Sequence, residues 1–367
     1  MRRHYPICRK APAFRHGEYV NIMRCALYYS NKDIRIIEKD IPKINGDEIL
    51  MKVMASGICG SDVIEWYRRD KTPLVLGHEV TGVIAEVGEN VKGYKVGDRI
   101  CAAHHVPCNT CKYCLSGHHT VCDTLRSTNF DPGGFSEFLR LPGINVKNGI
   151  YILPDSVSFE EGTFVEPLAC VVRGQRLAGV KPADTVAVIG SGLAGLLHIN
   201  LLRTTGATRI IATDINDKRL EYAKKFGADY VFNAGDKNID LPEAVKKIND
   251  GFLADIVILS TGAISAALQG LKSVRRGGTV LFFGAADEGA KLPLPINEIF
   301  WRTEVVLLSS YAGSMLDHRT ALELIRSKRI SVKDMITGRL PLKDIAEGFE
   351  LTAKAQDSLK IIINPNG

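Results

Sequence analysis

The sequence predicts an α/β protein in which a β-rich, barrel-like domain is followed by a doubly wound parallel sheet. From about residue 24 to residue 140, short apolar segments alternate with turn signals such as Asn45-Gly46 and Gly97-Asp98, a pattern typical of strands. From about residue 160 onwards, strand-like and helix-like segments alternate, which indicates parallel strands joined by right-handed crossovers. One of these strands runs directly into a glycine-rich turn that opens a helix, as in nucleotide-binding sheets.

The two parts of the chain differ in the elements that we expect from them. In the first part, the expected strands are Ile49–Met54, Val80–Val87 and Arg99–Ala102. In the second part, apolar runs predict strands over Thr185–Ile189, Arg209–Thr213, Ala254–Leu259 and Thr279–Phe283. Helical patterns predict helices over Glu160–Ala178, Leu193–Thr204, Lys218–Phe226 and Thr320–Ser327, and a last strand is expected over Leu359–Ile363.

Length and composition indicate a globular protein of two domains. The chain has 367 residues, of which 45% are hydrophobic and 24% are charged. No run of eighteen apolar residues occurs, so we expect no transmembrane helix and no membrane partner. Five cysteines are scattered along the chain, which favours a reducing, cytoplasmic location: Cys8, Cys25, Cys59, Cys101 and Cys170.

The formal net charge of +6 does not indicate nucleic-acid binding, because much of the excess lies at the N-terminus. Residues 1–22 contain five arginines and lysines but only one acidic residue, Glu18, and the rest of the chain is nearly balanced. This segment lacks the apolar core of a secretory signal, and we expect a disordered extension. An upstream start codon, with Met23 as the natural beginning, and an organelle transit peptide are the alternatives.

Four cysteines within fifteen residues form the most informative motif of the chain, Cys108-x2-Cys111-x2-Cys114-x7-Cys122. Four thiolates so close together can complete a tetrahedral shell around Zn²⁺ and leave no open position. A disulfide framework is the alternative, but such frameworks belong to small secreted chains. The spacing therefore predicts a closed zinc site.

A dinucleotide site is predicted where the strand Thr185–Ile189 meets the sequence Gly190-Ser-Gly192-Leu193-Ala-Gly195. The glycines permit a tight turn, a close approach of pyrophosphate and close packing of helix on sheet, and the helix start supplies amide donors. Asp214 ends the next strand and can accept hydrogen bonds from both ribose hydroxyls, so NAD is expected rather than NADP. Arg219 is a further cofactor-binding candidate, although a solvated helix face is the favoured interpretation of Lys218 and Arg219.

A second set of possible metal ligands is dispersed along the chain. Cys59 lies in Gly57-Ile-Cys-Gly-Ser-Asp62, and His78 follows nineteen residues later within Gly77-His78-Glu79. Glu166 could add a carboxylate from a distant segment. Zinc sites that perform chemistry combine three such protein ligands with one open position. Each residue alone has a structural explanation, and only together do they indicate a catalytic site.

With these motifs, residues 24–367 resemble the zinc-dependent medium-chain alcohol dehydrogenases, and more narrowly the sorbitol and threonine dehydrogenase branch. The stretch Gly77-His78-Glu79-x2-Gly82-x5-Gly88-x2-Val91 is similar to the zinc signature of that family. Gly97-Asp98-Arg99, the four-cysteine motif and the glycine fingerprint follow in the family's order. The resemblance implies a GroES-like catalytic barrel to which the C-terminal tail returns, followed by a Rossmann domain.

The resemblance also assigns roles to the residues. It implies two zinc ions per subunit, a structural one in the cysteine motif and a catalytic one held by Cys59, His78 and either Glu166 or Glu79. Ser61 resembles the hydroxyl that takes the proton of the substrate, and Asp62 resembles the carboxylate that orients the histidine ligand. The acidic third ligand favours a secondary alcohol on a polyol or sugar-derived substrate, oxidised with NAD.

One position departs from many relatives, because Ile64 stands where they carry a proton-relaying histidine. Glu65, His104 and His105 are the candidates for another proton path, and Cys170 is expected to be a core residue. Three other functions stay open: threonine oxidation, a zinc-free quinone reductase, and a non-enzymatic zinc-binding protein.

The expected domains are a catalytic domain formed by residues 23–166 and 312–367 and a dinucleotide-binding domain formed by residues 167–311. The apolar strand Val305–Leu308 near the sheet edge resembles a segment through which relatives join two sheets. We therefore expect a homodimer or homotetramer, with a small-molecule alcohol as the ligand.

Overall fold

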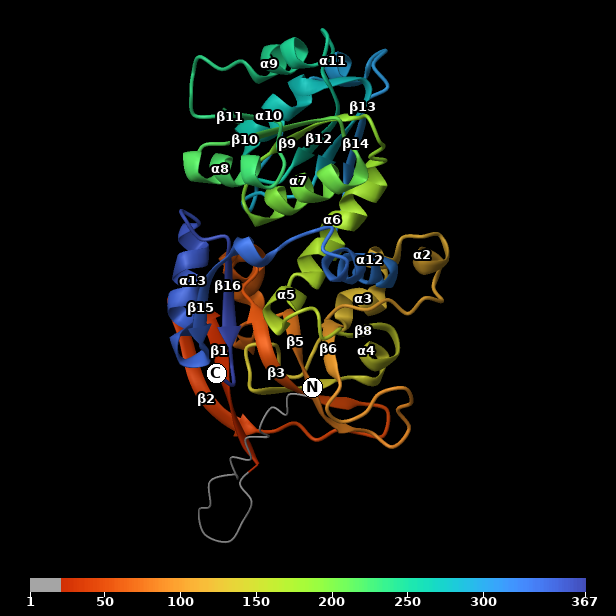
Figure 1. The fold of residues 1–367 in the computed structure, drawn as a ribbon, viewed down its shortest axis with the longest axis vertical. Coiled ribbons are helices and arrows are strands. Elements are labelled where there is room, and N and C mark those ends of the chain that lie inside the picture. Colours follow the sequence, from red (N-terminus) through yellow and green to blue (C-terminus); the bar gives the residue numbers. More distant parts are fainter. Residues whose placement is uncertain (1–20) are drawn as a thin grey trace, which may run out of the picture.

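The computed structural model describes residues 21–367, which form two lobes connected by a long helix, α6 (Val165–Ala178) (Figure 1). The lower lobe in Figure 1 is built mainly from strands, and the upper lobe is a sheet with helices packed around it. The extension predicted for residues 1–22 lies outside the described residues except for Asn21 and Ile22, and Ile22 already begins a strand.

The main sheet of the strand-rich lobe has the order β15-β16-β3-β5-β6-β8, with β7 also paired to β3. The tail of the chain supplies β15 and β16, so it returns to the first lobe as expected. The strands of this main sheet are β3 (Ile49–Gly57), β5 (Glu79–Val87), β6 (Arg99–Ala103), β7 (Phe138–Leu141), β8 (Ile150–Ile152), β15 (Ile336–Pro341) and β16 (Lys360–Asn364). A smaller sheet of order β2-β1-β4 contains β1 (Ile22–Ser30), β2 (Asp33–Asp40) and β4 (Leu74–Val75).

The second lobe contains a six-stranded sheet of order β11-β10-β9-β12-β13-β14, in which all strand pairs are parallel. Alternate residues of the strand Thr185–Ile189 pack into two different apolar clusters. Val186 and Val188 lie with residues of α7 (Leu193–Thr205), whereas Ala187 and Ile189 lie with residues of α9 (Leu241–Ile248) and α10 (Ile264–Ser273). Helices therefore cover both faces, which confirms the doubly wound Rossmann architecture. The strands are β9 (Thr185–Ile189), β10 (Arg209–Asp214), β11 (Tyr230–Asn233), β12 (Ala254–Leu259), β13 (Val274–Phe282) and β14 (Val306–Ser309).

The helices of the second half of the chain alternate with strands, as the sequence predicts, and there are more helices than were expected. They are α7 (Leu193–Thr205), α8 (Asp217–Lys225), α9 (Leu241–Ile248), α10 (Ile264–Ser273), α11 (Ile296–Phe300), α12 (Met315–Arg326) and α13 (Ile345–Lys354). The helix expected over Thr320–Ser327 begins five residues earlier, because Ser314 and Asp317 form a capping box at its start. Within residues 21–367, no helix has both the length and the apolar character needed to cross a membrane.

The single helix expected over Glu160–Ala178 is wrong, because the structure has two helices there. The first is α5 (Phe159–Gly162), and α6 begins at Val165. Pro167 explains the break: a proline lacks the N–H group of a continuous helix and clashes with the carbonyl group four residues before it, but it is tolerated in a first turn. The break places Glu166 in the first turn of a new helix.

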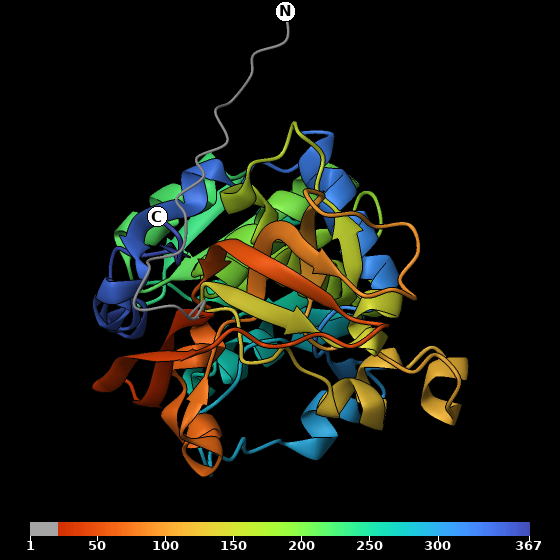
Figure 2. The same cartoon turned by 90° about the horizontal axis from the view of Figure 1, so that it is seen from below.

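The remaining segments of the first lobe form short helices. They are η1 (Gly60–Val63), α1 (Glu65–Arg68), η2 (Arg69–Lys71), α2 (Lys112–Leu115), η3 (His119–Val121), α3 (Asp123–Ser127), α4 (Gly143–Asn148), η4 (Lys333–Met335) and η5 (Leu342–Asp344). Figure 2 shows that the segment containing α2 projects away from the body of this lobe. The domain division at residues 166 and 312 stays a prediction; these positions lie in the first turn of α6 and between β14 and α12.

Candidate functional site

The four cysteines of the sequence motif meet in the projecting segment around α2. Their four sulfur atoms all lie within 4.8 Å of one another. The Cys111–Cys114 and Cys122–Cys108 sulfur pairs are each separated by 3.6 Å. This distance is too long for a disulfide, whose sulfur atoms are ~2.05 Å apart. It fits a tetrahedron around zinc, because Zn–S bonds of ~2.3 Å place neighbouring sulfur atoms about 3.8 Å apart.

The backbone around Cys108 favours its thiolate form. The amide nitrogens of Thr110 and Cys111 donate hydrogen bonds to Cys108 Sγ over 3.5 and 3.3 Å. Hydrogen bonding by Thr110, followed by the Cys111 amide, lowers the pKa of Cys108 to about 5. The donor set therefore suits a cation that binds thiolates, and it offers no position for a substrate.

A second group forms where β3 and β5 run side by side. Gly57 at the end of β3 pairs with Glu79 at the start of β5. Cys59 follows Gly57 by two residues and His78 directly precedes Glu79, so the sheet register brings these side chains together. One ligand atom from each of Cys59, His78 and Glu79 lies within 4.8 Å of the others. Sulfur, imidazole nitrogen and carboxylate oxygen are all ligands that zinc accepts.

Glu79 is held from its other side by a lysine of the C-terminal strand. Both Glu79 and Lys360 are completely buried, and Lys360 Nζ forms an ion pair with Glu79 Oε2. Lys360 Nζ also donates a hydrogen bond of 3.1 Å to the carbonyl oxygen of Ile58. Gly57 makes room for this carboxylate, because a Cβ atom there would lie 2.2 Å from Glu79 Oε2. Glu79 Oε1 is buried and has no hydrogen-bond partner among the described residues, as a ligand atom facing a metal would be.

Asp62, in η1, is completely buried and orients His78. Its Oδ1 atom lies 3.4 Å from His78 Nδ1 and 3.2 Å from Arg68 Nη2, and its Oδ2 atom accepts from the Cys59 amide over 3.1 Å. A carboxylate at Nδ1 leaves the Nε2 atom of His78 available to a metal. Ser61 Oγ lies 3.4 Å from Cys59 Sγ and accepts a hydrogen bond of 3.3 Å from Arg68 Nη2. The side chains of Ser61 and Asp62 thus both accept hydrogen bonds from the guanidinium group of Arg68.

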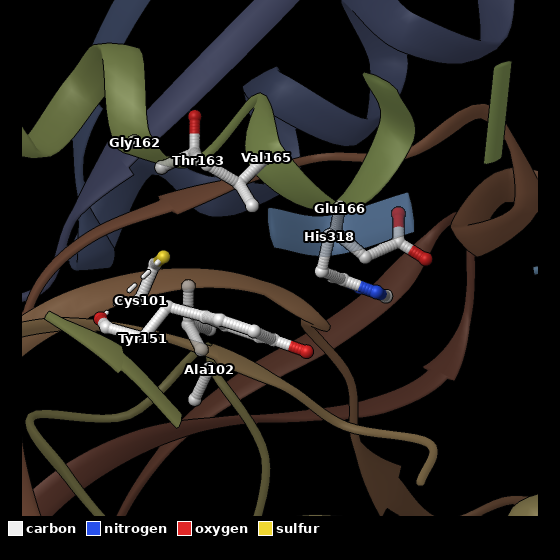
Figure 3. A pocket seen from close by; sticks show the side chains of 9 residues that line it. Cys101, Ala102, Tyr151, Gly162, Thr163, Val165, Glu166 and His318 are labelled. Carbon is white, nitrogen blue, oxygen red and sulfur yellow. Dashed lines mark hydrogen bonds between the residues drawn. The ribbon is translucent and has the colours of Figure 1, made fainter. Parts of the chain in front are cut away.

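Glu166 lies near the second group but outside it. Cys170, one helical turn further along α6, donates from Sγ to Glu166 Oε1 over 3.5 Å. Burial raises the pKa of Glu166 above its ordinary value. Figure 3 shows Glu166 beside His318 and Tyr151 in a pocket between α6 and the strands of the first lobe. Cys59, His78 and Glu79 do not line that pocket.

The histidine pair of the sequence lies next to His78. The rings of His104 and His78 are 4.8 Å apart between centroids, and those of His104 and His105 are 3.7 Å apart. His105 Nδ1 lies 2.6 Å from the carbonyl oxygen of Thr128, and burial lowers the pKa of His105 to about 4. Both side chains are partly exposed. Glu65 instead accepts a hydrogen bond from the Asn31 amide over 2.9 Å.

The glycine turn of the second lobe has the geometry of a phosphate cradle. Gly190 has a φ of +94°, which only glycine adopts without strain, and a Cβ atom at Gly195 would lie 1.9 Å from the Gly190 carbonyl oxygen. At Gly192, by contrast, the nearest heavy atom to an added Cβ is Arg219 Nη1 at 3.9 Å, so the backbone there is open to a ligand. Helix α7 begins at Leu193, and no side chain caps it. Its free amides suit a pyrophosphate.

Asp214 lies beside this turn at the end of β10. It accepts hydrogen bonds from the amides of Ser191 over 2.8 Å and Asn216 over 3.0 Å. Arg219 Nη1 lies 3.8 Å from Asp214 Oδ2, and Arg219 Nη2 donates to the carbonyl oxygen of Ala355. The predicted cofactor-binding residues therefore lie around the carboxyl ends of β9 and β10. They are Gly190, Gly192, Leu193, Gly195, Asp214 and Arg219.

Two residues near the second group were not found from the sequence. Lys360 had a detectable signal, since a lysine at the start of the apolar run Ile361-Ile362-Ile363 needs a buried carboxylate partner. Arg68 had none, because Arg68-Arg69-Asp70-Lys71 reads as an ordinary charged surface segment.

Two family models match the chain. The model for the alcohol dehydrogenase GroES-like domain matches residues 45–148, and the model for zinc-binding dehydrogenases matches residues 194–327. The first match contains Cys59, His78, Glu79 and the cysteine motif, and the second begins inside the glycine fingerprint.

Relatives match along nearly the whole chain. The sorbitol dehydrogenase of Bacillus subtilis is 30% identical over 359 residues, which cover 94% of this chain and 98% of that protein. A protein named as a D-xylulose reductase A from Neosartorya fischeri is 33% identical over 341 residues, covering 90% of this chain and 93% of the relative. Among solved structures, one described as a zinc-binding dehydrogenase from Sinorhizobium meliloti, bound to NADP, has a TM-score of 0.83 and 28% identity, covering 94% of this chain and 99% of the other.

Proposed function

We propose, from the premise that this chain belongs to the zinc-dependent medium-chain alcohol dehydrogenase family, that it oxidises a secondary alcohol of a polyol or sugar-derived substrate with NAD. The dehydrogenase activity and the sorbitol dehydrogenase-like branch follow from the family and its relatives. The substrate and the preference for NAD are our proposal.

The observation that carries the proposal is the open group of Cys59, His78 and Glu79. It provides three different ligand types within 4.8 Å of one another. The Oε1 atom of Glu79 is buried and lacks a hydrogen-bond partner among residues 21–367. Catalytic zinc sites use three protein ligands and leave one position for substrate. We assign the catalytic zinc to these residues, with Glu166 nearby as a further carboxylate, and the structural zinc to the four cysteines.

When bound at Cys59, His78 and Glu79, zinc would supply Lewis acidity that lowers the pKa of a substrate hydroxyl, and a nicotinamide cofactor would supply the hydride acceptor. The protein's own part is to hold the proton and the ligands in place. Ser61 Oγ would accept the proton of the substrate hydroxyl while its own hydroxyl proton passes to solvent. Arg68 Nη2 donates to Ser61 Oγ, which fixes the orientation of the serine and leaves a lone pair free to accept. Asp62 keeps His78 in the orientation that presents Nε2.

NAD is proposed as the cofactor because of the carboxylate of Asp214. Its two oxygens accept from backbone amides and retain lone pairs that can accept from ribose hydroxyls. A 2′-phosphate in that place would meet a negative charge. The nearby Arg219 is the group that could favour NADP, and its side chain is directed to Asp214 and to the Ala355 carbonyl oxygen.

A homodimer or homotetramer is proposed from the edge of the parallel sheet. Strand β14 is the last strand of its sheet, and Val306 within it is 50% exposed. Exposed apolar side chains also precede it, at Ile296, Phe300 and Trp301. An open apolar strand edge is normally covered, and a second copy of the same edge would cover it.

The test is NAD reduction by the zinc-loaded protein across polyols, sugar acids, inositols and threonine, with the zinc content measured on the same preparation. We expect two zinc ions per subunit and oxidation of at least one polyol or sugar-derived alcohol, faster with NAD than with NADP. Oxidation of threonine alone would exclude the polyol substrate class. A fully zinc-loaded protein that oxidises no alcohol would exclude the proposed function.

A further inference from the structure

Two cationic side chains gather over one aromatic ring beside the catalytic group. The Arg68 guanidinium lies 4.6 Å, and the Lys71 ammonium 4.0 Å, from the centroid of the Tyr67 ring. Cations are attracted to aromatic faces, so the Tyr67 ring stabilises each of the two positive charges. Both charges are therefore held at the same side chain.

Arg68 connects this pair to the reacting centre. Its side chain is only 12% exposed, and its Nη2 atom lies 3.3 Å from Ser61 Oγ and 3.2 Å from Asp62 Oδ1. Its Nε atom donates to the Ser61 carbonyl oxygen over 3.2 Å. The Nη1 atom makes no hydrogen bond with the described residues, so two N–H donors stay available. The unengaged Nη1 group can donate a charge-assisted hydrogen bond to an anion.

The acidic groups of the same segment do not neutralise Lys71. Within the described chain, Lys71 forms no ion pair with a carboxylate, and its side chain is exposed. Asp70 lies 3.8 Å from Arg69, and Glu65 accepts from a backbone amide. The positive charge of Lys71 is therefore available to a ligand.

The segment lies where the two lobes meet. Arg69 Nη2 is 2.6 Å from Glu288 Oε1, in the loop that follows β13 of the parallel sheet. Because Arg68 Nη2 donates to Ser61 Oγ, a substrate whose hydroxyl reaches Ser61 comes close to Arg68, and the exposed Lys71 follows three residues later.

We propose that Arg68 and Lys71, gathered at Tyr67, form an anion-binding subsite that takes a carboxylate or phosphate group on the part of the substrate that does not react. This inference rests on the proposed function and narrows its substrate class to acidic sugar derivatives, that is, sugar acids or polyol phosphates. A carboxylate and a phosphate share the recognition chemistry, and only the experiment separates them.

The experiment compares three substrates of equal chain length: sorbitol, gluconate and sorbitol 6-phosphate. The zinc-loaded enzyme is assayed with saturating NAD as wild type, as Lys71→Gln, and as Lys272→Gln. Lys272, on α10, is exposed and forms no ion pair among the described residues, so it provides the same chemical change away from the cleft. Because charge-assisted hydrogen bonds at a half-buried site are strong, we expect kcat/KM to be about tenfold higher for one anionic substrate than for sorbitol.

In Lys71→Gln this ratio of anionic to neutral kcat/KM should fall roughly tenfold, mainly through KM, and Lys272→Gln should keep the wild-type ratio. The preferred substrate identifies the anion as a carboxylate or a phosphate. If sorbitol is oxidised at least as well as both anions and Lys71→Gln leaves the ratio unchanged, the subsite is wrong although the dehydrogenase function stands.

Direct binding tests the subsite even if none of the three compounds is oxidised. Inorganic phosphate and gluconate are titrated calorimetrically into the zinc-loaded, NADH-saturated protein, so that the pyrophosphate cradle is filled. Either anion could also bind the metal, and therefore only the affinity that is lost in Lys71→Gln and kept in Lys272→Gln supports the subsite. Equal affinity of both variants and wild type for both anions would overturn it.

Discussion

The two candidate zinc groups differ in how much of the protein each one needs. The cysteine quartet lies within fifteen residues, its sulfur atoms face one another, and nearby backbone amides support it. The group of Cys59, His78 and Glu79 depends on two paired strands, on Asp62, and on a lysine from the far end of the chain. The first group is closed and local, whereas the second is open and assembled from distant segments.

This difference indicates what each group is for. Four thiolates with no open position can stabilise a projecting segment, but they cannot hold a substrate. A group that keeps one position open must be maintained by its surroundings, because its buried charges need partners when substrate is absent. Changes in the two groups should therefore affect different measured properties.

Removing one ligand of the open group gives the largest expected effect. In Cys59→Ala, turnover should fall at least about a thousandfold, since roughly 4 kcal/mol of transition-state stabilisation is lost with the metal. NADH binding, measured by fluorescence titration, should stay close to that of wild type, because the nucleotide cradle belongs to the other lobe. Zinc content should fall from two ions to one. A purified Cys59→Ala protein with unchanged kcat would contradict the assignment.

Lys360→Met tests the dependence of the open group on a distant segment. The substitution leaves the fully buried Glu79 carboxylate without its cation, which should lower the free energy of unfolding by about 3–5 kcal/mol. The matched control is Lys354→Met, whose pair with Glu350 is more than half exposed, and its expected cost is below about 1 kcal/mol. Urea unfolding measures the loss of unfolding free energy in both variants. Equal losses would show that the buried pair contributes no more to stability than the exposed pair does.

The contrast also explains how much the sequence could predict. The quartet was predictable because its geometry follows from spacing within one segment. The parallel sheet was predictable because its strands are long apolar runs, and β9 and β12 have the expected bounds. The geometry that favours Glu79 over Glu166 was not predictable, since it depends on the register of β3 with β5 and on the break before α6. Arg68 was hidden for the same reason: only the folded chain places it against Ser61 and Asp62.

A change in the closed group should act on stability more than on chemistry. In Cys111→Ser, the free energy of unfolding should fall by about 2–3 kcal/mol, because a structural metal site loses one of its four ligands. At a temperature where the variant is folded, kcat should stay within about threefold of the wild-type value. This corresponds to a change of less than about 1 kcal/mol in the activation barrier. Thermal unfolding and steady-state kinetics on the same preparation measure the two effects. Normal stability combined with loss of kcat would reverse the roles of the two groups.

The buried histidines His78 and His198 also differ, because their surroundings shift their pKa values in opposite directions. Burial lowers the pKa of His78, but Asp62 and Cys59 outweigh burial and raise that pKa well above its ordinary value. Among residues 21–367, no charged group acts on the pKa of His198, on α7. Its Nδ1 atom lies 3.2 Å from Gln175 Nε2, and its ring meets Phe283 edge to face. Burial alone lowers the pKa of His198 to about 3. His198 is therefore a core residue that stays neutral, unlike the carboxylate-supported His78.

His198→Gln tests this assignment through the pH dependence of stability. Between the unfolded pKa of ~6.5 and the folded pKa of about 3, the unfolded chain binds one more proton at this position than the folded protein does. The free energy of unfolding should therefore fall as the pH falls, and His198 should contribute up to about 1.4 kcal/mol per pH unit to that slope. Urea unfolding at pH 7, 6 and 5 should show a flatter slope in His198→Gln, whatever its absolute stability, and the wild-type slope in the exposed control His118→Gln. An unchanged slope in His198→Gln would mean that this histidine is protonated in the folded protein.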